Sequence, residues 1–125
     1  MKILNDLEQL VKAKYPYLFI ERSANEFKIK INQISNKVMM LDNDVLIIRN
    51  NNVIVQSFIQ FEPWEWESKG YLLKCNRSKT AKLHDYNLFL FEKDLEYIDV
   101  QYKHVVNKYK SHELEIKKKT IDKDF

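Results

Sequence analysis

Three apolar runs separated by short Asx clusters constrain the fold of this chain more than any other feature. The runs cover residues 38–41, 45–49 and 53–62, and the clusters Asp42–Asp44 and Asn50–Asn52 stand between them. Asn and Asp tolerate a positive φ and can hydrogen-bond to their own backbone, so they can turn a chain that contains a single glycine. β-Branched and long apolar residues bounded by such turns are typical of strands. The stretch therefore predicts an antiparallel meander at the centre of the domain.

The side chains of these runs alternate between two faces. In the third run, one face is apolar apart from Ser57, and the opposite face mixes apolar and polar residues. The first two runs are apolar on both faces, so their second side must also be covered. Amphipathic helices from the two ends of the chain are the available cover. The residues of the apolar face in the third run are Val53, Val55, Ile59 and Phe61.

Helical periodicity occurs at both ends of the chain. The spacing of Ile3, Leu7 and Val11 predicts a helix over residues 3–14 that ends before Pro16. Near the C-terminus, apolar residues from Leu95 to Ile116 follow a 3–4 spacing, and Asp94 is a suitable N-cap. Residues 95–103 also alternate as a strand would, so both interpretations stay open, with the longer 3–4 pattern favouring a helix. We expect this helix to pack on its own sheet, with a homodimer through the same seam as the alternative.

The remaining segments complete an α+β prediction. Strands are expected at residues 17–22, 27–31, 71–75 and 86–91, with a loop at 76–82 and an edge or exit strand at Pro63. The predicted fold is a largely antiparallel β-sheet of five to seven strands, with an N-terminal helix and a C-terminal helix packed on one face. We expect one domain over residues 1–116 and a frayed basic tail over residues 117–125.

Composition bounds the class of protein but not its activity. The 125 residues carry a net charge of +3 from 21 basic and 18 acidic side chains, which is too even to require a polyanionic partner. Abundant Lys, Asn and Ile with scarce Gly, Ala, Pro and Arg suggest an A/T-rich genome, such as that of a bacterium, a phage or a parasite. The single Cys75 excludes an internal disulfide, the N-terminus does not resemble a signal peptide, and no apolar run approaches the roughly 20 residues that cross a bilayer. We expect a cytoplasmic protein without a membrane association.

The most unusual segment is acidic and aromatic. Trp64 and Trp66 would share one face of an extended strand, with Glu65 and Glu67 on the other. Exposed indoles would anchor a protein partner, and the carboxylates would favour a basic one. The alternative is that both indoles lie in the core, where large aromatic residues of small domains usually lie.

A second candidate site is the basic segment 74–84, which contains no acidic residue before Asp85. It could contact phosphates of a nucleic acid or nucleotide, with Tyr71 and Tyr86 available for base stacking and the hydroxyls of Ser78 and Thr80 as further donors. The alternative is a solvated loop that balances the glutamates of residues 62–67. The candidate phosphate-binding residues are Lys74, Arg77, Lys79, Lys82 and His84.

Catalytic signals are weak. Cys75 has basic neighbours that could lower its pKa, and His84 or His104 could lie near it, but this set matches no nucleophile signature. His104 and His112 are eight residues apart, which is not the spacing of a helical metal site. One glycine cannot make a phosphate-binding Gly-rich loop. We therefore expect no enzyme, no metal and no cofactor, and we interpret Cys75 as a buried strand residue.

These observations favour a small non-enzymatic binding module with a protein partner, of the kind that phages and mobile elements use to inhibit or sequester a host target. The rival hypothesis is a nucleic-acid or nucleotide-binding protein that uses the basic segment 74–84.

Overall fold

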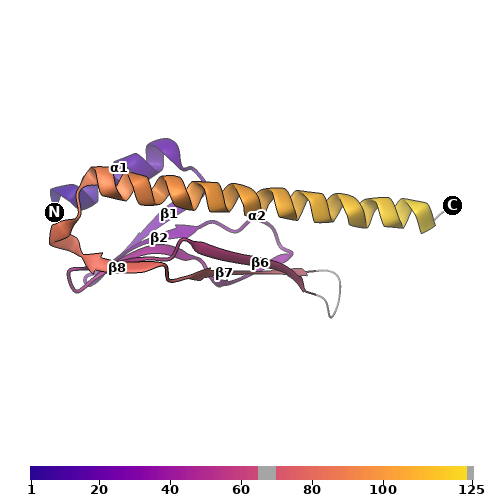
Figure 1. Cartoon of the computed structure of the whole chain (residues 1–125), viewed down its shortest axis with the longest axis horizontal. Helices are drawn as coiled ribbons and strands as arrows, with labels where there is room; N and C mark the ends of the chain where they lie inside the picture. Colours follow the sequence, from indigo (N-terminus) through magenta and orange to yellow (C-terminus); the bar gives the residue numbers. More distant parts are fainter. Residues whose placement is uncertain (65–69, 124–125) are drawn as a thin grey trace.

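Two helices lie on the same side of two β-sheets (Figure 1). The computed structural model describes residues 1–64 and 70–123. Helix α1 spans Lys2–Lys14, a 3-10 turn spans Leu83–Asp85, and the long helix α2 spans Leu88–Lys123. In Figure 1, α2 runs over both sheets and extends past their ends.

The eight strands form one sheet of five and one of three. The five-stranded sheet has the order β1-β2-β4-β5-β8 and is antiparallel throughout. The three-stranded sheet has the order β3-β7-β6, in which β3 and β7 are parallel. The bounds are β1 Leu18–Arg22, β2 Glu26–Ile31, β3 Val38–Asp42, β4 Asp44–Arg49, β5 Asn52–Val55, β6 Phe58–Trp64, β7 Gly70–Asn76 and β8 Lys79–Lys82.

This architecture confirms the predicted α+β class, with largely antiparallel sheets and a helix from each end of the chain on one face. The described residues form eight strands, where five to seven were predicted. The third apolar run is divided into β5 and β6 at Gln56 and Ser57, and the predicted loop at residues 76–82 contains strand β8, so that prediction was wrong. Strand β8 forms because its backbone pairs with β5, with Val53 opposite Ala81.

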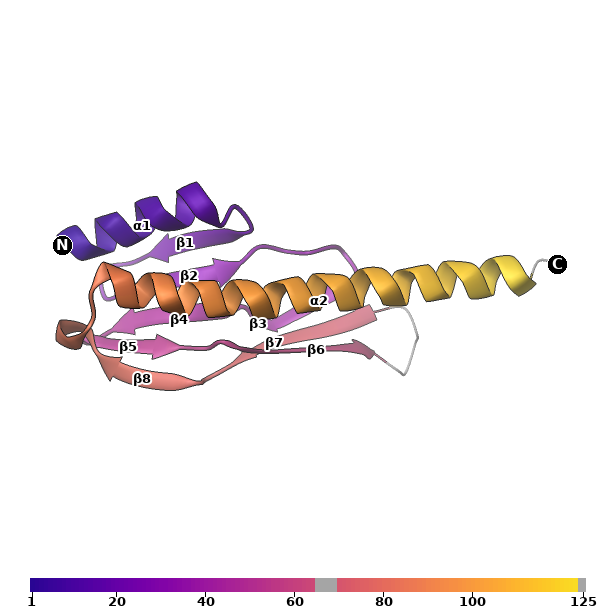
Figure 2. The same ribbon diagram turned by 45° about the horizontal axis from the view of Figure 1, so that its top comes forward.

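The two sheets are joined by a crossing of two chain runs. One run is β5 followed by β6, and the other is β7 followed by β8. In the five-stranded sheet β5 lies between β4 and β8, whereas in the three-stranded sheet β7 lies between β3 and β6, so the two runs exchange places (Figure 2). The exchange occurs at Ser57 and Ser78, whose side-chain oxygens are 2.8 Å apart. The Ser78 backbone N–H also donates to the Val55 carbonyl at 2.8 Å.

Only the second turn of the predicted meander exists. Strands β4 and β5 form a hairpin with Arg49 opposite Asn52. The first predicted turn was wrong, because β3 and β4 belong to different sheets. At this joint the Asp42 carboxylate accepts the Asp44 N–H at 3.0 Å, and the Asn43 amide donates to the Ile31 carbonyl at 2.9 Å. The Asx side chains therefore stabilise a joint at which the chain passes from one sheet to the other. A turn that reverses the chain was predicted here.

Asn50 and Asn51 form the hairpin turn with φ values of 51° and 60°. Valine is β-branched and disfavours a positive φ, so Asn51→Val should lower the free energy of unfolding by about 1–2 kcal/mol, whereas Asn51→Gly should leave it unchanged or raise it. Urea denaturation measures both. Asn25→Val, at an exposed turn position without a positive φ, is the matched control. Equal losses in the two valine variants would contradict this explanation.

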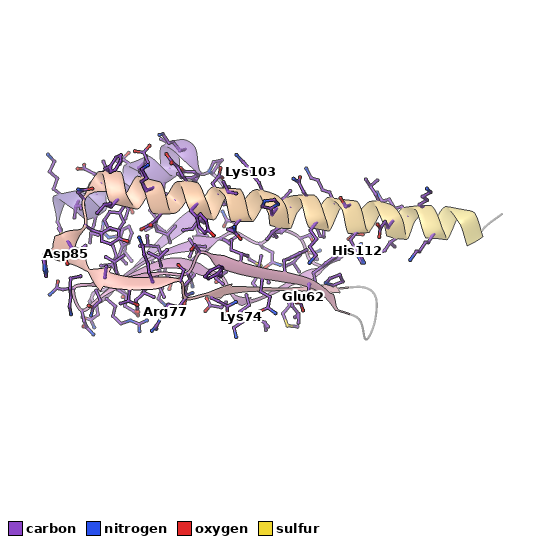
Figure 3. The ribbon with its side chains drawn as sticks, viewed as in Figure 1. Glu62, Lys74, Arg77, Asp85, Lys103 and His112 are labelled. Atoms are coloured by element: carbon purple, nitrogen blue, oxygen red, sulfur yellow. The ribbon has the colours of Figure 1, made fainter. Side chains whose placement is uncertain are left out.

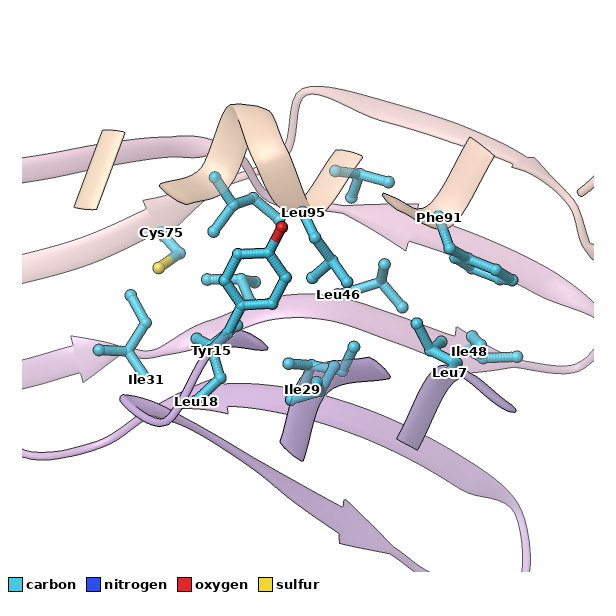
Figure 4. Packing of buried hydrophobic residues seen from close by; sticks show 14 of the residues in the cluster. Leu7, Tyr15, Leu18, Ile29, Ile31, Leu46, Ile48, Cys75, Phe91 and Leu95 are labelled. Carbon is cyan, nitrogen blue, oxygen red and sulfur yellow. The ribbon is translucent and has the colours of Figure 1, made fainter. Parts of the chain in front are cut away.

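The core lies between the helices and the inner face of the sheets. Leu7 of α1 and Phe91 and Leu95 of α2 are completely buried, as are Ile29 and Leu46 of the five-stranded sheet (Figure 4). The seam of α2 therefore packs on the chain's own sheets, as predicted, and residues 95–103 are helical. At the far end of the sheets the Tyr71 ring lies 5.0 Å from that of Tyr109.

Helix α2 begins before the predicted start, and the strand predicted at residues 86–91 was wrong. Asn87 caps the helix, because its side-chain oxygen accepts the Leu90 N–H at 2.9 Å. A short apolar run such as Leu88–Phe91 fits either a buried strand or a helix, and this cap decides for the helix. The helix extends through residues 117–123, and the fraying expected of this tail stays a prediction. No Gly or Pro occurs after Gly70 to end it.

The helices cover only one face of each sheet, so the prediction that they cover the second side of the first two runs was wrong. On β3, Met39 and Leu41 are exposed. On β4, Ile47 is buried although no helix covers it. Its neighbours on the adjacent strands, Lys28 of β2 and Ile54 of β5, lie directly opposite it on either side. The outer surface of the sheets is therefore open to a partner or to solvent.

Candidate functional site

A groove opens where the two chain runs cross and α2 passes beside them. It has a volume of about 270 Å³. Residues before and after the crossing form its walls together with one side of α2. We refer to it as the crossover groove, and its lining residues are Val55, Ser57, Phe58, Ser78, Lys79, Asp94 and Tyr97.

Two aromatic rings form the exposed rim of the crossover groove. Phe58, at the start of β6, is 55% exposed, and Tyr97 of α2 is 49% exposed. Large aromatic side chains are costly to leave in water and are enriched at protein interfaces. Because Phe58 comes from β6 and Tyr97 from α2 and both line one groove, this groove is suited to contact an apolar group.

The polar groups of the groove are already paired with one another. The Ser78 hydroxyl donates to the Val55 carbonyl at 3.0 Å and lies 2.8 Å from the Ser57 hydroxyl. The Lys79 ammonium lies 2.8 Å from the Asp94 carboxylate, which also accepts a hydrogen bond from the Tyr86 hydroxyl at 2.6 Å. The groove therefore holds two separate sets of paired polar groups, and in one of them a positive charge meets a negative charge.

Lys79 and Tyr86 both keep their protons near neutral pH. Burial lowers the pKa of Lys79, but hydrogen bonds to Asp94 and Tyr86 and the charge of Asp94 outweigh it, so the pKa is raised above its ordinary value. Burial and the hydrogen bond to Asp94 raise the pKa of Tyr86. Lys79 therefore keeps its proton and is unsuited to act as a general base toward Ser57 or Ser78.

The basic residues predicted to bind phosphate do not form one patch. Lys79 faces α2 and is paired with Asp94, whereas Lys82 alternates to the opposite face of β8. Lys74 and Arg77 lie on the side of the sheets away from α2 (Figure 3). His84 lies in the 3-10 turn, 3.4 Å from Asp85.

The aromatic residues predicted to stack on bases are also engaged elsewhere. Tyr71 is buried, and its hydroxyl lies 2.9 Å from Nδ1 of His112. Burial, together with the nearby Glu113, raises the pKa of Tyr71 to about 12. Tyr86 donates to Asp94 and lies below the Lys79 ammonium, 5.4 Å from ring centre to nitrogen. Neither ring is therefore available to stack on a base beside unpaired lysine or arginine side chains.

The acidic and aromatic segment remains a prediction. Trp64 is the last residue of β6, paired with Gly70, while Glu65, Trp66 and Glu67 lie outside the described residues.

Cys75 lies on the inner face of β7 among buried apolar side chains (Figure 4). Burial, with smaller contributions from Asp42 and Asp44, raises its pKa to about 12, which leaves almost no thiolate at neutral pH. In residues 1–64 and 70–123, no three His, Cys, Asp or Glu side chains are arranged to hold a metal ion. No helix in this part of the chain has the length and apolar composition needed to span a bilayer.

The sequence patterns did not predict the crossover groove, although they assigned two of its residues to faces that point away from the core. Phe58 falls on the mixed face of its run, and Tyr97 falls outside the 3–4 seam of α2. A large aromatic residue at a position that periodicity assigns to solvent is a signal for an interface. The sequence does not show that both residues line one groove.

The described part of the chain thus belongs to the α+β class, with two sheets that are joined by crossing chain runs and lie under one long helix. Comparisons with protein-family models, curated proteins and solved structures give no match to this chain.

Proposed function

We propose that this protein is a non-enzymatic binding module that receives a large apolar side chain of a protein partner in the crossover groove. The observation that carries the proposal is that two half-exposed aromatic residues, Phe58 of β6 and Tyr97 of α2, line one groove of about 270 Å³. That volume suits one large side chain. Anchors of this kind supply most of the binding energy in protein interfaces.

The charge of the groove favours a protein partner over a nucleic acid. The lining contains one cation, Lys79, and one anion, Asp94, which neutralise each other at 2.8 Å. A phosphate in the groove would have to compete with Asp94 for the only ammonium, and affinity for nucleic acid depends on uncompensated cations. An apolar side chain needs no such exchange.

Strand addition to the three-stranded sheet is a less suitable mode of binding, because a side chain already donates a hydrogen bond to each of its outer strands. The Lys108 ammonium of α2 donates to the Phe61 carbonyl on β6 at 2.9 Å. The Gln33 amide donates to the Val38 carbonyl on β3 at 2.5 Å. Contacts of this kind oppose pairing of a foreign strand with β6 or β3.

Removal of both rings should abolish specific binding. The wild-type protein, Phe58→Ala/Tyr97→Ala and a matched control, Phe89→Ala/Val100→Ala, are used to purify partners from the native host, and the captured protein is then titrated in purified form. The control removes two side chains of α2 that are exposed but do not line the groove. We expect the groove variant to raise the Kd by at least about 30-fold and the control by less than about threefold.

Thermal melts of all variants establish that the fold is retained. Equal weakening by both double variants would contradict the groove as the binding site. Loss of binding in Trp64→Ala or Trp66→Ala, with the groove variant unaffected, would instead assign the partner to the acidic and aromatic segment predicted from the sequence.

A further inference from the structure

A second groove lies beside the C-terminal half of α2, on the side of the helix that faces the start of β3. It has a volume of about 480 Å³. We refer to it as the distal groove, and it is lined by Lys37, Tyr109, Lys110, Glu113, Leu114 and Lys117.

The single anion of the distal groove is already used by the fold. The Lys37 ammonium lies 3.0 Å and 3.2 Å from the two carboxylate oxygens of Glu113. The hydrogen bond and charge of Lys37 hold the pKa of Glu113 below its ordinary value against the opposing effect of burial. The Tyr109 hydroxyl donates to Ser35 at 3.0 Å. These contacts attach α2 to the loop before β3 and leave no further acid in the lining of the groove to balance the other lysines.

The remaining residues of the distal groove form a stripe of cation, apolar side chain and cation. Lys110, Leu114 and Lys117 are spaced i, i+4 and i+7, so they lie on one face of the helix, and the two lysines are about 10 Å apart along its axis. Neither lysine has an ion-pair partner among residues 1–63 and 70–119, whose side chains the structure describes. Leu114 between them is 66% exposed, the most exposed leucine of the described residues.

We propose that the distal groove binds an acidic segment of a protein partner, in which an apolar side chain contacts Leu114 and flanking carboxylates pair with Lys110 and Lys117. Charge complementarity selects the acid, because two cations in this groove lack a counter-charge. The exposed leucine and the Glu113 carboxylate select a peptide over a phosphate backbone, which would place charge against an apolar surface. This surface lies on a different side of α2 from the crossover groove and does not depend on it.

The chain offers an internal control of equal charge. Lys118 and Lys119 are exposed on the same helix, adjoin Lys117 in sequence and do not line the distal groove. Lys110→Glu/Lys117→Glu and Lys118→Glu/Lys119→Glu therefore change the net charge by the same amount, but only the first pair alters the groove.

The probe is a labelled peptide of Glu-Glu-Leu repeats, titrated at physiological ionic strength against the full chain. A peptide with Gln in place of every Glu serves as the comparison. We expect Lys110→Glu/Lys117→Glu to weaken binding of the Glu peptide at least tenfold, Leu114→Ala to weaken it several-fold, and Lys118→Glu/Lys119→Glu to change it less than threefold. Phe58→Ala/Tyr97→Ala should bind the peptide as the wild type does. Circular dichroism melts verify that each variant is folded.

Three results would overturn the proposal. The first is an equal loss of affinity in the two charge-reversal variants, which would mean that only the general charge of the helix attracts the peptide. The second is equal affinity for the Glu and Gln peptides. The third is tighter binding of a single-stranded oligonucleotide or of vesicles containing phosphatidylserine under the same conditions, which would assign these lysines to a phosphate surface.

Discussion

Replacing Phe91 with alanine should lower the free energy of unfolding by about 3–5 kcal/mol, the range typical of a large aromatic side chain removed from a closed core. Phe91 is completely buried, and its ring lies 4.6 Å from that of Tyr86, near the start of α2. Alanine would leave a cavity between α2 and the five-stranded sheet that the paired strands below cannot close. Urea denaturation followed by circular dichroism measures the loss.

Phe89→Ala is the matched control on the same turn of the helix. Phe89 is 63% exposed and contacts Lys93, whose ammonium lies 5.2 Å from the ring centre. Its removal should cost less than about 1 kcal/mol, the size of an exposed cation–π contact. Similar losses in the two variants would mean that the first turns of α2 do not pack on the sheet as described.

Stability should fall steeply as pH rises above 9, because the fold holds several acidic protons that the unfolded chain releases. Burial raises the pKa of Cys75 from 9.0 to about 12 and that of Tyr71 from 10.0 to about 12. Burial and the hydrogen bond to Asp99 also raise the pKa of Tyr17. The unfolded state therefore loses these protons first, so their contribution is complete below pH 9 and is lost as pH rises toward 12.

Each such group should reduce the free energy of unfolding by about 1.4 kcal/mol per pH unit between its unfolded and folded pKa values. Cys75 is the first to act, so the wild-type curve should begin to fall near pH 9. In Cys75→Ala the decline should begin nearer pH 10, where tyrosine titrates in the unfolded chain. Urea denaturation at half-unit pH intervals gives both curves. Parallel curves between pH 9 and 10 would show that the thiol is not protected by burial.

Much of the fold could be predicted because local patterns and tertiary packing agree there. The alternation of Phe27, Ile29 and Ile31 predicts a half-buried strand, and these three residues are buried on the inner face of β2. Pro16 marks the end of α1, and the 3–4 spacing from Leu95 onward marks the helical seam. In each case one face of one element determines the pattern.

The errors occurred where the outcome depends on a distant part of the chain. Residues 42–44 have the composition of a turn, yet the pairing of β3 with β7 in the other sheet carries the chain forward instead. Residues 79–82 have no apolar alternation, and they become a strand only because β5 offers a free edge. A polar segment gives no local sign of such a partner.

The crossover groove lies beyond prediction from local sequence for the same reason. Its lining comes from four different elements, β5, β6, β8 and α2, and from the two joints at Ser57 and Ser78. The distal groove is closer to prediction, because Lys110, Leu114 and Lys117 share a helical face that periodicity can identify. What the sequence omits there is that Lys37 reaches across to neutralise Glu113.

The crossing of the two runs also determines how the molecule can come apart. A three-stranded sheet is close to the smallest unit that is stable by itself, and it would ordinarily be the first part of a domain to open. Here each of its strands continues directly into a strand of the larger sheet, through joints as short as Asn43 alone or the pair Arg77 and Ser78. Separation of β6 or β7 from the small sheet would therefore also disturb β5 or β8 in the large sheet. The stability of the small sheet is thus coupled to that of the large sheet, and both should unfold as a single cooperative unit.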